Sequence, residues 1–130
     1  METKKTALII TDGTESIQKL ADVIAASLGE NRVTILSASR LAGTDMLSAD
    51  AVFIGCEEPN PASFAYLAEL LRHINLAGRP CGLFSFRSKK AAAYLSDLVH
   101  DSELALDREI LFGSDAGGVS KWAERIAGKS

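Results

Sequence analysis

The sequence predicts a three-layer α/β sandwich: a five-stranded parallel sheet of spatial order 2-1-3-4-5 with helices on both faces. Apolar runs recur along the 130 residues with helical patterns between them. The clearest runs are continuous rather than alternating, which is typical of strands covered on both faces. Right-handed crossovers leave few other arrangements for such an alternation. We find no linker or internal repeat, so one domain over residues 1–130 is expected.

The first half of the chain predicts three strands. Residues 7–10 form the first, residues 33–36 a less apolar second strand near an edge, and residues 51–54 the third. The segment 37–50 predicts either a short helix or an irregular crossover containing Leu41, Met46 and Leu47. The helix after the first strand stops at Gly29. Its apolar stripe is Ile17, Leu20, Ala21, Ile24, Ala25 and Leu28.

The second half continues the alternation. Residues 82–86 predict the fourth strand, residues 89–99 a helix and residues 109–112 the fifth strand. The helix before the fourth strand is closed by Gly78 and Pro80. Its apolar stripe is Phe64, Leu67, Ala68, Leu71 and Ile74 or Leu76. The last helix is lined by Val119, Trp122 and Ile126.

Composition argues against several classes of protein. The formal charge of -3 argues against binding to DNA or RNA, because nucleic-acid affinity rests on clustered Lys and Arg. No apolar stretch approaches the roughly 20 residues of a membrane helix, and the start of the chain lacks the apolar region of a signal peptide. We therefore expect a soluble, cytoplasmic protein. Cys56 and Cys81 have no metal-ligand spacing, no metal site is predicted, and both thiols are expected to be free.

A sheet of this order predicts where a ligand binds. The crevice lies beyond the carboxyl ends of strands 1, 3 and 4, where neighbouring connections diverge. This rule selects three loops, namely residues 11–16, 56–63 and 85–90. The first is rich in hydroxyl groups and runs directly into a helix, so its free N–H groups suit a phosphate.

At these residues the chain resembles the flavodoxin family. The likeness is carried by residues 7–16, 47–55 and 76–84 and, with the final helix, spans nearly the whole chain. The resemblance implies non-covalent binding of FMN and electron transfer with a redox partner protein. The chain would then be an electron carrier rather than an enzyme with its own substrate, and it would have no catalytic residues.

In the family, the loop after strand 1 reads roughly Ser/Thr-x-Thr-Gly-Asn-Thr and holds the FMN phosphate. Thr11 and Ser16 match the outer hydroxyl positions, while the central residues differ. The carboxylates in this loop would repel a phosphate by roughly 1 kcal/mol or more. Alternatively, Thr11 or Thr14 simply caps the helix. The resemblance implies phosphate contacts from Thr11, Asp12, Gly13, Thr14, Glu15 and Ser16.

The other two loops would flank the flavin ring. The resemblance implies ring contacts from Cys56, Glu57, Glu58, Pro59 and Asn60 on one side, and from Ser85, Phe86, Arg87 and Ser88 on the other. The second loop lacks the aromatic residue that family members place there, and Phe64 is expected in the core. Its glutamates would either lower the flavin potential or form a solvated loop.

The start of the fourth helix carries the cations Arg87, Lys89 and Lys90, which oppose the positive end of its dipole. Glutamates across the crevice, an anionic ligand or an acidic partner protein could offset them. Ion pairs with Glu57 and Glu58 are the plainest expectation.

Two other classes of function compete with the electron carrier. The first is a flavin-free domain of the same fold used for interaction or regulation. A receiver domain is rejected as a version of it, because Gly55-Cys56 and Gly113-Ser114 stand where a receiver needs Asp and Lys. The second is a thiol-based enzyme, which requires Cys56 to react readily near neutral pH.

Overall fold

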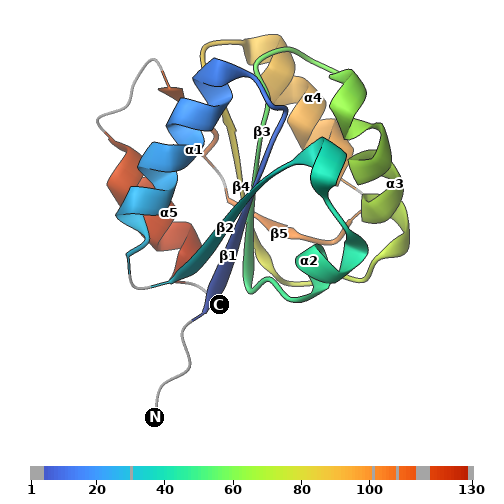
Figure 1. Ribbon diagram of the computed structural model, residues 1–130, viewed down its shortest axis with the longest axis horizontal. Helices are drawn as coiled ribbons and strands as arrows, with labels where there is room; N and C mark the ends of the chain where they lie inside the picture. The colour runs from blue at the N-terminus through green and yellow to red at the C-terminus, as the bar shows by residue number, and fades with distance from the viewer. Residues whose placement is uncertain (1–4, 30, 101, 108, 114–117, 129–130) are drawn as a thin grey trace.

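The computed structural model describes residues 5–29, 31–100, 102–107, 109–113 and 118–128. A parallel sheet stands between two layers of helices (Figure 1). The strands are β1 (Thr6–Thr11), β2 (Arg32–Ser37), β3 (Ala51–Gly55), β4 (Pro80–Ser85), β5 (Ala105–Leu106) and β6 (Leu111–Phe112). The helices are α1 (Glu15–Ser27), α2 (Gly43–Leu47), α3 (Ala65–His73), α4 (Lys89–Val99) and α5 (Val119–Ala127), with 3₁₀ turns η1 (Ala38–Arg40) and η2 (Ala62–Phe64). No described helix is both long and apolar enough to cross a membrane.

The strand order is β2-β1-β3-β4-β5 and every pairing is parallel, which confirms the predicted topology. Strand β1 pairs with β2 along its whole length and with β3 on its other side. Strand β4 follows β3 in the sheet. The carboxyl ends of β1, β3 and β4 therefore lie side by side at one end of the sheet, as the crevice rule requires.

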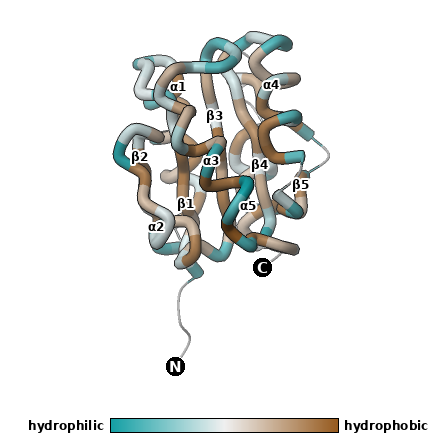
Figure 2. Tube along the Cα trace, turned by 90° about the vertical axis from the view of Figure 1, so that its right-hand side faces the viewer, coloured by the Kyte–Doolittle hydropathy of each residue, from teal (hydrophilic) through white to brown (hydrophobic). Residues whose placement is uncertain are grey.

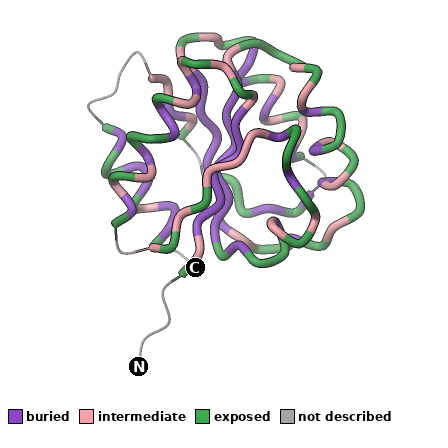
Figure 3. Tube along the Cα trace, viewed as in Figure 1, coloured by how far each residue is buried: buried purple, intermediate pink, exposed green. Residues whose placement is uncertain are grey.

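Both faces of the sheet are covered, which explains the continuous apolar runs. In β1, Leu8 and Ile10 pack into a core beneath α2, α3 and α4. Ala7 and Ile9 pack into a second core beneath α1 and α5. Figure 3 shows the buried strands between the two helical layers. Figure 2 shows that the same strands are the hydrophobic centre of the molecule.

The fifth position of the sheet differs from the expected single strand at 109–112. Strand β5 pairs with the start of β4, and β6 pairs with its end. Between β5 and β6, Asp107 and Glu109 form hydrogen bonds with residues of α5. The Asp107 carboxylate accepts hydrogen bonds from Arg125 at 3.2 and 2.7 Å, and the Glu109 carbonyl accepts one from the Trp122 indole at 2.9 Å. These contacts attach the chain to α5 between the two short strands, while the Asp107 N–H still donates to the Cys81 carbonyl of β4 at 2.9 Å.

The weakly patterned segment 37–50 contains both a short helix and an irregular crossover. Helix α2 has five residues and buries Met46, while Leu47 is half exposed. One nitrogen of Arg79 donates to the carbonyls of Met46, Leu47 and Ala49 at 2.8 to 2.9 Å. This guanidinium adds a donor to the carbonyl groups at and just beyond the end of so short a helix, where intrahelical partners run out.

Gly82 lies at a close contact between the sheet and α5. A Cβ atom there would lie 2.6 Å from Ile126 Cδ1 and 2.9 Å from Trp122 Cζ2, both in the α5 core. We expect Gly82→Ala to lower the free energy of unfolding by about 1–3 kcal/mol through overpacking. Gly29→Ala is the matched control, because a Cβ atom there meets nothing within 4 Å. Urea unfolding measures both, and equal effects would contradict the packing argument.

Candidate functional site

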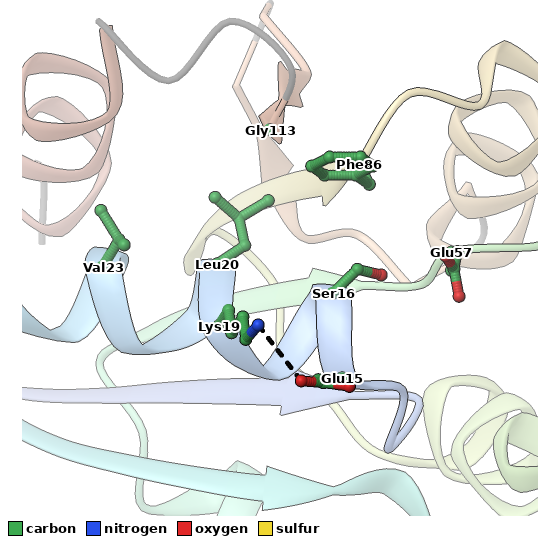
Figure 4. A pocket seen from close by; sticks show the side chains of 8 residues that line it. All are labelled: Glu15, Ser16, Lys19, Leu20, Val23, Glu57, Phe86 and Gly113. Atoms are coloured by element: carbon green, nitrogen blue, oxygen red, sulfur yellow. Dashed lines mark ion pairs between the residues drawn. The ribbon is translucent and has the colours of Figure 1, made fainter.

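The three predicted loops meet at one cavity of about 560 Å³ at the carboxyl end of the sheet. Glu15 and Ser16 line it from the first loop, Glu57 from the second and Phe86 from the third. The rest of the lining was not predicted from the sequence: Lys19, Leu20, Val23 and Gly113. Figure 4 shows Leu20 and Val23 pointing from α1 toward the side of the cavity where Phe86 lies. The cavity therefore extends along α1 as well as between the loops.

The start of α1 presents unused hydrogen-bond donors. Thr14 is the residue before the helix, and its side chain makes no capping hydrogen bond. Gln18 is the first residue of the helix whose N–H finds a backbone acceptor, the Thr14 carbonyl at 2.9 Å. Among the described residues, the N–H groups of Glu15, Ser16 and Ile17 have no acceptor. The helix start is therefore not closed by Thr11 or Thr14, contrary to the capping alternative.

Ser16 adds a hydroxyl group to this helix start. Its Oγ atom is buried and has no hydrogen-bond partner among the described residues. In Figure 4 this side chain lies between α1, Phe86 and Glu57. Buried polar atoms are seldom left unpaired in native proteins. The orphaned hydroxyl and the adjacent amides form a donor-rich corner of the cavity.

Asp12 uses two other amides of the loops for itself. Its Oδ1 atom accepts from the Thr14 N–H at 2.9 Å and from the Thr14 hydroxyl at 2.6 Å. Its Oδ2 atom accepts from the Glu57 N–H at 2.8 Å. The nearby Gly13 N–H is directed to Thr11 Oγ1 at 3.3 Å. One carboxylate thus joins the first loop to the second.

The second loop provides little apolar surface to the cavity. Cys56 is fully buried, and Glu58, Pro59 and Asn60 are exposed outside the lining. Glu57 is the lining residue from this loop. Phe64 is 1% exposed and packs on Tyr94 with ring centroids 6.4 Å apart. Its expected core role is confirmed, and it is not a stacking group for a ligand.

The third loop supplies the aromatic surface that the second lacks. Phe86 lines the cavity, and the Arg87 guanidinium lies over its ring at 4.8 Å from the centroid. Ser88 does not face a ligand, since its Oγ accepts the Ala91 N–H at 3.0 Å and caps α4. Ser85 is fully buried, and its Oγ has no partner among the described residues.

The expected ion pairs across the crevice are absent from the described part of the chain. The cations at the start of α4 form no ion pair with Glu57 or Glu58 there. Arg87 instead makes its cation–π contact with Phe86. Within the cavity lining, Lys19 pairs with Glu15 at 3.1 Å, and both side chains are largely exposed. Exposed pairs of this kind contribute little to stability.

Comparison with known proteins identifies the fold but gives no sequence relative. No family model and no curated protein sequence matches the chain. The structure is similar to a flavodoxin from Streptococcus pneumoniae TIGR4, at a TM-score of 0.80 and 17% identity over 96% of this chain and 99% of that one.

Two further solved structures agree. A short-chain flavodoxin associated with a bacterial microcompartment gives a TM-score of 0.83 at 14% identity, over 98% and 99% of the two chains. Oxidised flavodoxin 2 from Bacillus cereus gives 0.81 at 19% identity, over 96% and 99%. At such identities the likeness establishes the backbone arrangement alone. With its sheet order, its flanking helices and these neighbours, the chain has the flavodoxin-like fold.

Proposed function

We propose that this chain binds FMN in the cavity beside α1 and serves as an electron carrier for a partner protein. The observation that carries the proposal is the meeting of all three predicted loops at one cavity, next to helix amides that have no acceptor among the described residues. Its volume of about 560 Å³ falls within the roughly 300–1,000 Å³ typical of small-molecule sites. When bound, the flavin supplies the redox chemistry, and the protein supplies position and electrostatics.

The phosphate would be held at the start of α1. The amides of Glu15, Ser16 and Ile17 have no acceptor among the described residues, and the Ser16 hydroxyl beside them is orphaned. A helix start also carries the positive end of the helix dipole, which favours an anion. These residues fit a phosphate because they offer donors that nothing else in the described structure uses.

The ring would be held by apolar side chains. Leu20, Val23 and Phe86 line the cavity, and Val23 is 47% exposed there. Burying such surface against a flat aromatic ring is favourable, and Phe86 adds a π face. Glu57 lies in the same lining and would place negative charge near the flavin. That charge disfavours addition of an electron and would lower the potential.

A flavin-free interaction domain is the second candidate. It is favoured by the Asp12 carboxylate, which occupies the amides of Thr14 and Glu57. A phosphate that depended on those two amides would find them already used. The two candidates differ in whether the amides at the start of α1 suffice for binding.

Reconstitution separates the two candidates. After incubation with FMN and removal of free flavin, we expect the protein to retain about one flavin per chain with quenched fluorescence. The apolar ring contacts and the free amides of α1 are the physical reason. Absorbance of the desalted protein gives the ratio, and fluorescence gives the quenching. Desalted protein without flavin would favour the interaction domain.

The aromatic wall can be tested by substitution. We expect Phe86→Ala to weaken FMN binding by at least about fivefold, because an aromatic contact contributes about 1 kcal/mol in addition to the area it buries. Tyr66→Ala is the matched control, since Tyr66 is 51% exposed on α3 and does not line the cavity. Fluorescence titration measures both variants. A loss of affinity shared by the control would argue against a ring site at Phe86.

The structure disfavours the thiol-based enzyme. Cys56 is fully buried, and burial, with the nearby charges of Asp12 and Glu58, raises the pKa of its thiol to about 12. Burial likewise raises the pKa of the Cys81 thiol to about 12. Both cysteines are free, as expected. A thiol must ionise to act as a nucleophile, and these remain protonated at neutral pH.

Thiol labelling measures this directly. At pH 7.5 we expect both cysteines of the native protein to react with a chromogenic disulfide reagent at least a hundredfold more slowly than a free thiol. In denaturant, the same sample should react at once and release two equivalents of the reagent's chromophore per chain. This result would show that both thiols are intact. Rapid labelling of one thiol in the native protein would restore the enzyme hypothesis.

A further inference from the structure

We infer that the Asp12 carboxylate competes with the phosphate of the ligand for the same backbone amides. This competition determines how tightly the chain binds a phosphate. The inference rests on the proposed function for the identity of the ligand. Its geometric basis is independent of any flavin, because it concerns the amides at the junction of the first two loops.

The carboxylate takes the place that an anion would need. Its two oxygens accept from the amides of Thr14 and Glu57, at 2.9 and 2.8 Å. The Thr14 hydroxyl donates to it as well, at 2.6 Å. An external anion bound by both amides would have to lie where this carboxylate lies. In the protein as it stands, a phosphate is left with the first amides of α1 and the Ser16 hydroxyl.

Asp12 can weaken phosphate binding by occupying hydrogen-bond donors, which is a different effect from repelling the phosphate by charge. Asp12 is partly buried, and its charge is balanced by the three donors that surround it. Glu15 is an exposed carboxylate at the same helix start, paired with Lys19, and it accepts no amide from the described residues of the loops. Neutralising Glu15 removes charge alone, whereas replacing Asp12 removes charge and releases donors. The two positions therefore form a matched pair.

The experiment uses inorganic phosphate as the probe. Phosphate is titrated into the ¹⁵N-labelled full chain, and the amide shifts of residues 14–17 and 57 are followed by NMR. We expect Asp12→Ala to tighten phosphate binding about tenfold, or about 1.4 kcal/mol, because each released amide can donate to the anion. Asp12→Asn should fall between this variant and the wild type, since Asn can still accept from Thr14 but not from Glu57. Glu15→Gln should gain no more than about twofold.

Several results would overturn the inference. Asp12 variants that bind phosphate no more tightly than the wild type would show that the carboxylate does not compete. A gain in Glu15→Gln equal to that in Asp12→Ala would show that charge alone acts. The amide spectrum also reports folding, and Asp12→Asn decides the matter if Asp12→Ala unfolds. Loss of the native spectrum in both variants would mark the carboxylate as purely structural and sink the inference.

Parallel titrations with FMN and riboflavin keep this test apart from the proposed function. Riboflavin lacks the phosphate, so the Asp12 substitutions should improve FMN binding and leave riboflavin binding unchanged. If no variant binds either flavin, the proposed function fails, while the phosphate titration still decides the role of Asp12. If FMN binds the wild type and both Asp12 variants equally, the proposed function stands and the inference fails.

Discussion

The arrangement of the candidate site depends on one carboxylate that bridges two loops. Asp12 follows β1 directly and accepts hydrogen bonds from the backbones of Thr14 and Glu57. The Ser63 hydroxyl donates to the Asp12 carbonyl at 3.4 Å, which also ties η2 to the same residue. These contacts position the residue before α1, so the first amides of the helix are left at the edge of the cavity. The donors that a ligand can use are therefore determined by those that Asp12 has taken.

The sheet was predictable because its signals are local. Residues 7–10 and 51–54 are continuously apolar, and both lie in strands whose alternate side chains enter different cores. The fourth helix matches the predicted range 89–99. Both of its signals, the spacing of its apolar residues and the capping residue Ser88, lie within or next to the helix in the sequence. The fifth strand was predicted only in part, for the opposite reason: residues 111–112 pair with β4, but the break before them and the separate pairing of residues 105–106 were not predicted. The contacts of Asp107 with Arg125 and of Glu109 with Trp122 join segments 18 and 13 residues apart, and no local pattern signals them.

The topology predicted where the cavity lies but not how it is lined. The crevice rule selected the loops that hold Ser16, Glu57 and Phe86. The part of the lining that α1 provides was not predicted. Leu20 was assigned to the core stripe of the helix, and Val23 lies outside that stripe. The sequence pattern also did not predict which partners the charged side chains would find. Opposite charges in neighbouring loops suggested ion pairs, but Arg87 lies over Phe86 instead, where a guanidinium can stack on an aromatic face.

An anion site is compatible with this acidic chain because its carboxylates are not equally effective at the cavity. Glu15 is exposed and paired with Lys19, so water and a cation screen it. Asp12 is surrounded by three donors whose dipoles oppose its charge. What remains at the cavity edge is the positive end of α1, whose first amides have no acceptor in the part of the chain that the structure describes. For the phosphate site proposed here, the acidic composition would therefore weaken binding less through repulsion than through the amides that Asp12 occupies.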